Sequence, residues 1–283
     1  MSDEGTPSDD VRLLRLLWRG DELPSARSGL TVDRVVASGV SLADGSGLAA
    51  VSMRRVAQDL GVGAMSLYTY VPGRTELVLL MADHVVGELV AAGWAPGERS
   101  ERDGGPEQDP AGRGATSERS ERDRGPDQKP TWRAGLRRMA EDFWALLERH
   151  PWLLDVPLTR TSFGPNAVES YEAQLAVVDG LGLDPLEMNA VLELVNEHVA
   201  GAARRLLAIR ADQESSGISD DDWWYGVEAT LVEVMAGKDY PLAGRVGVAV
   251  GAPHLDTSYL LQFGLERILD GLETLIATRR ESG

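Results

Sequence analysis

Cysteine is absent from the 283-residue sequence, which excludes disulfide bonds, thiolate metal sites and cysteine nucleophiles. Also missing is any apolar run near the ~20 residues that a membrane-spanning helix needs. The acidic first ten residues are unlike a secretion signal. We therefore expect a cytoplasmic protein that makes no membrane contact.

Motifs of the common enzyme classes are missing as well. The sequence has no Walker A loop, no HExxH zinc motif and no GxSxG nucleophile elbow, and its four histidines are too dispersed for a compact metal site. A helical small-molecule enzyme is disfavoured because no paired acid and base stands out. The sequence therefore predicts no metal site, no other cofactor and no enzymatic activity, and it leaves open whether a metal accompanies a bound ligand.

Positive charge is in short supply, since 28 basic residues face 45 acidic ones and the net charge is −17. Such an acidic surface disfavours general binding to nucleic acid. The surplus is uneven: residues 11–95 hold eight arginines and eight acidic residues, whereas residues 96–283 hold 20 basic and 33 acidic residues. Any nucleic-acid-binding face is therefore expected in the first hundred residues.

The apolar periodicity predicts an all-α protein. Helix-capping residues stand at Thr31, Ser52, Asp184 and Ser219, each just before an apolar periodic segment. Residues 246–250 are the only candidate strand, and this segment is short and flanked by glycine. The expected helices cover residues 11–19, 31–44, 52–60, 64–71, 75–92, 132–150, 165–180, 184–211, 219–236 and 256–280.

One segment, residues 96–130, shows no hydrophobic periodicity and is rich in Gly, Pro, Glu, Arg and Asp. It contains a near-duplication, ERSERDGGPEQDP at 98–110 and ERSERDRGPDQKP at 118–130. Two copies are too few for a solenoid, and the segment has little apolar surface to bury. We expect a disordered insert whose function the sequence does not reveal.

The most informative segment is SMRRVAQDLGVGAMSLYTY, residues 52–70. Two short helices separated by a glycine turn indicate a helix-turn-helix, although a plain helical hairpin has the same outline. Ala57 is small where the helices would cross, and Gly61 permits the backbone conformation of the turn. Val62 and Leu67 would hold the second helix against the first, which leaves its other side chains free to face a groove.

Over residues 29–81 the sequence resembles the TetR family of transcriptional regulators. The resemblance rests on Thr31, on VSMRRVAQDLGVGAMSLYTYV, and on GRTEL at 73–77; MSLYTYVPGRTELVLLM is typical of members with a tetracycline-repressor-like C-terminal domain. It implies an N-terminal extension (1–26), a three-helix DNA-binding domain (27–74), and an effector-binding and dimerisation domain (75–283) containing the insert. A long helix would join the last two parts.

The resemblance also implies DNA contacts. Residues 64–70 would form the recognition helix in the major groove, Tyr68 would contact phosphate, and Arg74 replaces the usual phosphate-binding lysine. Arg27 would belong to a short basic arm in the minor groove. Thr69 and Tyr70 depart from the family's common aromatic or basic residues, so the operator sequence is not predicted. The full predicted set is Arg27, Thr31, Ser52, Met53, Arg54, Gly63, Ala64, Met65, Ser66, Tyr68, Thr69, Tyr70 and Arg74.

A ligand pocket is expected in the C-terminal helices, where aromatic residues gather and polar groups stand on mostly apolar faces. The aromatics are Trp132, Phe143, Trp144, Trp152, Phe163, Tyr171, Trp223, Trp224, Tyr225, Tyr259 and Phe263. The alternative is ordinary core packing, and for His150 a helix C-cap. The predicted ligand-binding residues are Met139, Phe143, Leu147, His150, Trp152, Phe163, Tyr171, Gln174, Leu175, Val178, Leu192, Asn196 and Val199.

A homodimer interface is expected on two helices, because family members dimerise through a four-helix bundle. Internal packing of the last helix is the alternative. The predicted interface residues are Ala200, Gly201, Ala203, Tyr259, Leu260, Phe263, Ile268, Leu272 and Leu275.

These observations predict a repressor that a small hydrophobic or aromatic effector releases from a palindromic double-stranded operator. Two alternatives stay open: a transcriptional activator, and a helical small-molecule-binding protein whose DNA binding is weak or lost.

Overall fold

The computed structural model describes residues 9–19, 29–91, 131–156, 163–251 and 256–282, and all regular structure in these ranges is helical. The all-α prediction is therefore confirmed. Residues 246–250 are not a strand, because they belong to helix α10 (Pro241–Val250), which starts with a proline in its first turn and ends at Gly251 in the left-handed region. Arg27 and the insert 96–130 lie outside the described residues.

Spatial proximity divides the chain into two compact units. The first unit comprises residues 1–40, 52–139 and 157–180, and the second comprises 41–51, 140–156 and 181–283. This partition differs from the order along the sequence, so the boundary at 74/75 stays a prediction. Within the described ranges, no helix is long and apolar enough to cross a membrane.

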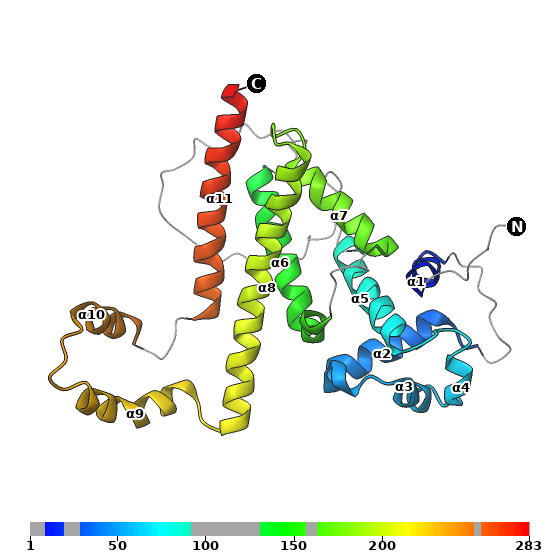
Figure 1. Ribbon diagram of the computed structural model, residues 1–283, viewed down its shortest axis with the longest axis horizontal. Helices are drawn as coiled ribbons and strands as arrows, with labels where there is room; N and C mark the ends of the chain where they lie inside the picture. The colour runs from blue at the N-terminus through cyan, green and yellow to red at the C-terminus, as the bar shows by residue number, and fades with distance from the viewer. Residues whose placement is uncertain (1–8, 20–28, 92–130, 157–162, 252–255, 283) are drawn as a thin grey trace, which may run out of the picture. The chain divides into compact units, whose positions relative to one another are not determined.

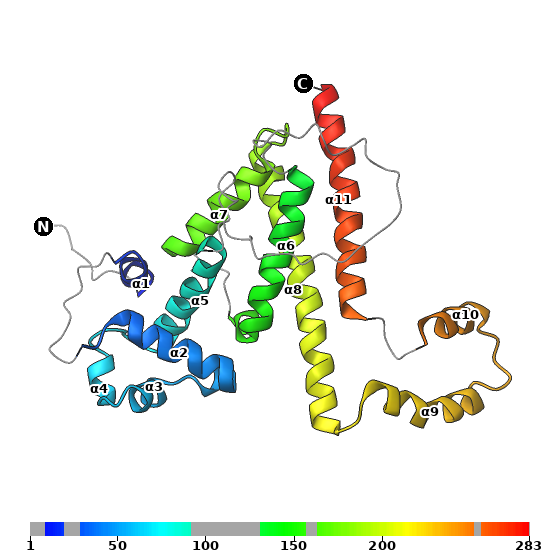
Figure 2. The same ribbon diagram turned by 180° about the vertical axis from the view of Figure 1, so that it is seen from behind.

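In the first unit, α5 and α7 lie side by side (Figure 2). Asp83 on α5 caps α7: its carboxylate accepts hydrogen bonds from the backbone N–H of Ala167 and the side-chain amide of Asn166, each at 3.0 Å. The helices of this unit are α1 (Asp9–Leu17), the first part of α2 (Val32–Ser46), α3 (Met53–Asp59), α4 (Ala64–Leu67), α5 (Arg74–Ala91), the start of α6 (Trp132–Arg149) and α7 (Pro165–Val178).

Helix α1 belongs to this unit through apolar packing. It contacts α5 and buries Leu13 and Leu17, which are 5% and 4% exposed. Just after the helix, the indole N–H of Trp18 donates to the backbone carbonyl of Phe163 at 2.6 Å. The N-terminal extension is thereby joined to the segment that precedes α7.

In the second unit, α8 and α11 run side by side (Figure 1). Asp184 caps α8 as predicted and forms a capping box with Glu187, since Asp184 accepts from the backbone N–H of Glu187 while the Glu187 carboxylate accepts from that of Asp184. The helices wholly in this unit are the 3-10 helices η1 (Leu48–Ala50) and η2 (Pro151–Asp155), α8 (Pro185–Ser216), α9 (Asp220–Val234), α10 and α11 (Thr257–Ser282).

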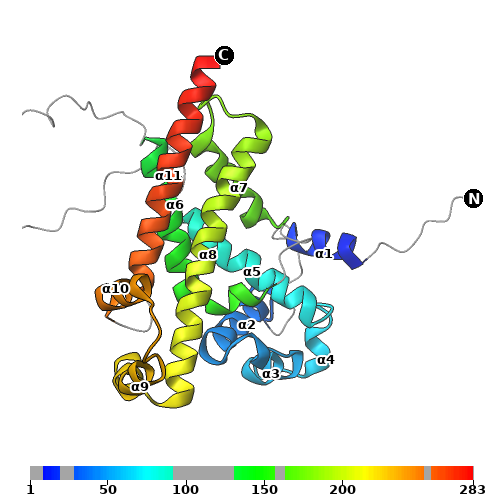
Figure 3. The ribbon, with the colours of Figure 1, turned by 60° about the vertical axis from the view of Figure 1, so that its left-hand side comes forward.

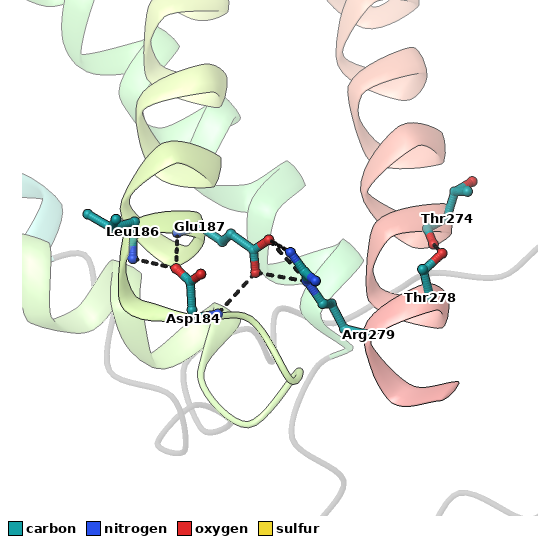
Figure 4. Close-up of polar contacts among 6 residues, drawn as sticks. All are labelled: Asp184, Leu186, Glu187, Thr274, Thr278 and Arg279. Carbon is teal, nitrogen blue, oxygen red and sulfur yellow. Dashed lines mark hydrogen bonds and ion pairs between the residues drawn. The ribbon is translucent and has the colours of Figure 1, made fainter. Parts of the chain in front are cut away.

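Glu187 has a second role, because its carboxylate also forms an ion pair with Arg279 of α11 (Figure 4). Further along the same helix pair, α8 and α11 approach closely at Gly264. A Cβ at this position would collide with the ring of His198, whose Nε2 lies 2.9 Å from the carbonyl oxygen of Leu261. Glycine at 264 is therefore what permits the close crossing.

Candidate DNA interface and effector cavity

The helix-turn-helix is built as its sequence predicts (Figure 3 shows α3 and α4). Ser52 caps α3, with its hydroxyl oxygen accepting from the backbone N–H of Arg55 at 3.3 Å. Gly61 takes a φ of 68° in the turn, and the N–H of Val62 donates to the carbonyl of Ala57 at 2.9 Å. Ala57 is buried at the helix crossing, together with Leu67 of α4.

This core leaves exposed side chains on α4 and on the turn that follows it. Met65 is 81% exposed and Tyr68 is 48% exposed, and Ser66 and Thr69 are exposed beside them. The helix itself is shorter than the predicted 64–71: it ends at Leu67, and turns follow in which Tyr70 and Val71 donate to the carbonyl of Leu67. The polar and apolar tips on this surface suit contact with base edges and phosphates.

Other predicted DNA-contacting residues differ in their exposure. Ser52, Arg54, Gly63 and Arg74 are exposed, while Thr31, Ala64 and Tyr70 are half-buried. Met53, the first residue of α3, is only 6% exposed, so its backbone rather than its side chain is available to a phosphate. The Thr31 hydroxyl caps α2 by accepting from the N–H of Arg34 at 3.2 Å.

The predicted ligand-binding residues fall into three groups by exposure. Seven are buried, four are half-buried, and Phe163 and Tyr171 are exposed at 63% and 41%. They also divide between the two units, so neither unit contains the whole set. The buried members are Met139, Leu147, His150, Trp152, Val178, Leu192 and Val199; the half-buried members are Phe143, Gln174, Leu175 and Asn196. The set therefore stays a prediction.

The second unit contains a cavity of about 630 Å³ between α6, α8 and the start of α11. Trp144, Leu206, Ile209, Leu261 and Leu265 give it an apolar lining. Its remaining lining residues are Ala140, Glu141, Glu148, Arg210, Gln213, Asp220, Asp256, Thr257, Ser258 and Gln262. Nine of these fifteen lining residues are polar or charged, and a cavity of this size can hold a small organic ligand.

This cavity uses a different face of α6 from the one that the sequence favoured. The stripe through Met139, Phe143 and Leu147 is the most apolar one, and its first and last members are buried at 2% exposure. Trp144 lines the cavity together with Glu141 and Glu148. In the sequence, a tryptophan among charged residues on the polar face of an amphipathic helix could have predicted this lining.

A smaller cavity of about 350 Å³ lies beside η2, and Trp152 is among its lining residues. Here the Asp44 carboxylate of α2 accepts hydrogen bonds from Nδ1 of His150 and Nε1 of Trp152, each at 2.7 Å. His150 directly follows α6, but its side chain is engaged with Asp44. The cluster joins the end of α2 to the segment after α6.

The predicted dimer residues lie on α8 and α11, which already pack against each other within one chain. Tyr259 and Phe263 are exposed and stack with ring centroids 6.0 Å apart, and the Arg267 guanidinium lies 5.4 Å from the Phe263 ring. Of the others, Ala200, Ala203 and Leu272 are buried, Gly201 is exposed, and Leu260, Ile268 and Leu275 are half-buried.

Comparison with known proteins shows which family this chain belongs to. The model of the family domain described as "Tetracyclin repressor-like, C-terminal domain" matches residues 125–276. The HTH-type transcriptional repressor DrrR1 of Streptomyces coeruleorubidus is 38% identical over 282 residues, covering 99% of this chain and 92% of DrrR1. The chain therefore belongs to the TetR family of transcriptional regulators. It is a regulator and not an enzyme, as its sequence predicts.

Solved structures share the fold. ActR of Streptomyces coelicolor, in complex with actinorhodin, has a TM-score of 0.58 at 24% identity, covering 86% of this chain and 95% of ActR. TetR of Acinetobacter baumannii has a TM-score of 0.54 at 18% identity, covering 87% of this chain and 98% of the other.

Proposed function

We propose that this chain is a cytoplasmic, ligand-responsive transcriptional repressor that binds a palindromic operator as a homodimer. The observation that carries the proposal is the exposed surface of α4, held over a fully buried helix-turn-helix core. Tyr68 and Arg74 supply phosphate contacts, and Met65, Ser66 and Thr69 face the bases. The name of the 38% identical relative, a repressor, favours repression over activation.

A dimer would present two α4 surfaces to one side of the DNA. Helix-turn-helix dimers read half-sites one helical turn apart, about 34–36 Å, and the symmetry of the protein is matched by a palindromic site. The chain has a net charge of −17, but residues 11–95 have equal numbers of basic and acidic residues. This N-terminal region therefore repels DNA phosphates less than the rest of the chain does. Binding should weaken steeply with salt because phosphate contacts supply much of the affinity.

Effector binding is assigned to the 630 Å³ cavity of the second unit. A ligand that fits this cavity better in the conformation that mismatches the operator shifts the population toward that conformation and releases the DNA. The complex of ActR with actinorhodin favours an aromatic effector.

The chain provides a route from the cavity to the DNA-binding helices. Glu148 lines the cavity, and His150 and Trp152 follow it along the chain and bind Asp44 of α2. Nearer the middle of the same helix, the Ser38 hydroxyl donates to the Asp59 carboxylate of α3 at 2.7 Å. A shift of α6 is therefore passed to α2, and from α2 to the helix-turn-helix.

The test is selection of bound fragments from the source genome by the purified protein, with a Tyr68→Ala variant in parallel. The proposal predicts one enriched palindromic sequence for the wild type and much weaker enrichment for the variant. Absence of any enriched sequence, with protein shown to be folded and dimeric, would instead favour a ligand-binding protein that has lost DNA binding.

A further inference from the structure

The polar lining of the 630 Å³ cavity is predominantly acidic. Four carboxylates, those of Glu141, Glu148, Asp220 and Asp256, face one cation, that of Arg210. An excess of carboxylates around a partly enclosed cavity raises the local concentration of cations and repels anions. The charge of the lining therefore indicates the charge of the ligand. This conclusion rests on the proposed function of the cavity as the effector site.

The negative charge of three of these carboxylates is stabilised by neighbouring groups of the protein. Glu148 is paired with Arg210, with 3.7 Å between Oε1 and the guanidinium nitrogen. Asp256 accepts from the backbone N–H of Tyr259 at 3.0 Å, and this bond and one from Ser258 lower the pKa of its carboxyl. Asp220 is the first residue of α9, where the helix dipole favours negative charge. Each of these three groups therefore has a partner or a favourable helix dipole before any ligand binds.

Glu141 differs from the other three. It lies inside α6 rather than at a helix start, and within the described ranges no ion pair reaches its carboxylate. Trp144 lies three residues further along the same helix, so both side chains project toward the cavity. Glu141 is solvent-exposed and Trp144 is half-buried. A carboxylate and an indole that line one cavity can together bind an organic ammonium group, because the charge attraction and the cation–π interaction act together.

We propose that the effector is a planar, largely apolar molecule that carries a protonated amine. Its ring body occupies the apolar part of the cavity, against Leu206, Ile209 and Leu265. Its ammonium group pairs with Glu141 next to Trp144. Neutral or anionic molecules of the same shape bind less tightly, because they leave the acidic lining without a counter-charge.

A matched probe series tests this assignment. The three probes are 9-anthracenemethylamine, 9-anthracenemethanol and 9-anthracenecarboxylate, which share one fluorescent ring and differ in charge. Their affinities for the full-length protein are measured without DNA, by fluorescence titration at neutral pH. We expect the amine to bind about tenfold more tightly than the alcohol, and the acid to bind most weakly.

Two variants separate the carboxylate from general effects. Glu141→Gln should weaken binding of the amine about fivefold and change binding of the alcohol less than twofold. Glu172→Gln on α7, an exposed carboxylate that does not line the cavity, should change neither. Circular dichroism of both variants verifies that they are folded.

The possible outcomes distinguish this inference from the proposed function. Equal binding of all three probes, tightest binding of the acid, no binding at all, or an unchanged amine affinity in Glu141→Gln would each overturn the inference. If the alcohol or the acid binds and releases the selected operator, the repressor assignment stands and only the ligand class is wrong. If the amine binds as expected but never affects operator binding, the ligand class stands and the assignment of this cavity as the site that controls operator binding fails.

Discussion

Asp44 and His150 are 106 residues apart in the sequence, yet Oδ1 of Asp44 lies 2.7 Å from Nδ1 of His150. The imidazole side chain is 9% exposed, and Nε1 of Trp152 donates to the same carboxylate oxygen. The rings of His150 and Trp152 meet edge to face, with centroids 6.1 Å apart. One carboxylate of α2 therefore satisfies two nearly buried donors that follow α6.

Replacing Asp44 with alanine should therefore destabilise the protein. Both ring nitrogens lose their acceptor, and an unsatisfied buried donor costs about 1–3 kcal/mol. Urea denaturation measures the change in the free energy of unfolding. The control is Asp33→Ala on the same helix, where the carboxylate paired with Arg19 is 79% exposed and the cost should stay below about 1 kcal/mol. Equal effects of the two variants would show that the Asp44 cluster adds nothing to stability.

Gly164→Ala should also destabilise, because a Cβ at this position collides with the Asp83 carboxylate that caps α7. Loss of such a cap costs about 0.5–2 kcal/mol. Asp83→Ala alone should cost a similar amount, and Gly164→Ala should be almost neutral when Asp83 is already alanine. Thermal or urea unfolding of the four proteins completes the cycle. Strictly additive effects would contradict a steric link between the two residues.

The crossing of α8 and α11 gives a third prediction. Gly264→Ala forces the His198 ring away from α11 and should lower stability by about 1–3 kcal/mol, as overpacking does. Gly226→Ala is the matched control within α9, where an added Cβ meets no atom within 4 Å. Its gain in helix propensity predicts unchanged or slightly higher stability. Differential scanning calorimetry compares both with the wild type, and equal melting temperatures would refute the close crossing.

The ion pair between Glu187 and Arg279 makes part of the stability depend on pH. The hydrogen bond from Arg279 lowers the pKa of Glu187 below its ordinary value of 4.5, and the backbone N–H of Asp184 lowers it further. A lowered pKa in the folded state contributes stability above pH 4.5, and this contribution is lost as the pH falls through the folded pKa.

Glu187→Gln should therefore lower the melting temperature at pH 7, and the difference from the wild type should shrink as the pH falls below 4.5. Glutamine retains an oxygen for the capping box, so the charge is tested separately from the cap. Glu193→Gln on the same helix serves as the control. A difference that is constant with pH would contradict the assignment.

Helix starts and the helix-turn-helix are predictable from the sequence because their causes are local. Thr31, Ser52 and Asp184 cap helices by bonding the backbone within three residues. The turn depends on Gly61, whose positive φ is required by the spacing of α3 and α4. Such features need no knowledge of distant parts of the chain.

Features that depend on distant contacts were not predictable in the same way. One local feature was also misread: residues 246–250 have strand-like composition, yet the nearby Pro241 and Gly251 provide the start and end of a helix. The strongest apolar stripe of α6 packs in the core, whereas the cavity is lined by its mixed polar face through Glu141 and Trp144. No sequence pattern predicts the contact between His150 and Asp44.

The measurement that tests the account most directly is the affinity of the selected operator for the wild type and for Arg74→Gln. Fluorescence anisotropy gives this affinity between about 50 and 200 mM salt. The account predicts steep salt dependence for the wild type. For Arg74→Gln it predicts weaker binding, with a logarithmic salt slope reduced by about one because one phosphate contact is lost. Identical affinity and slope for the two proteins would contradict a DNA interface formed by α4 and the start of α5.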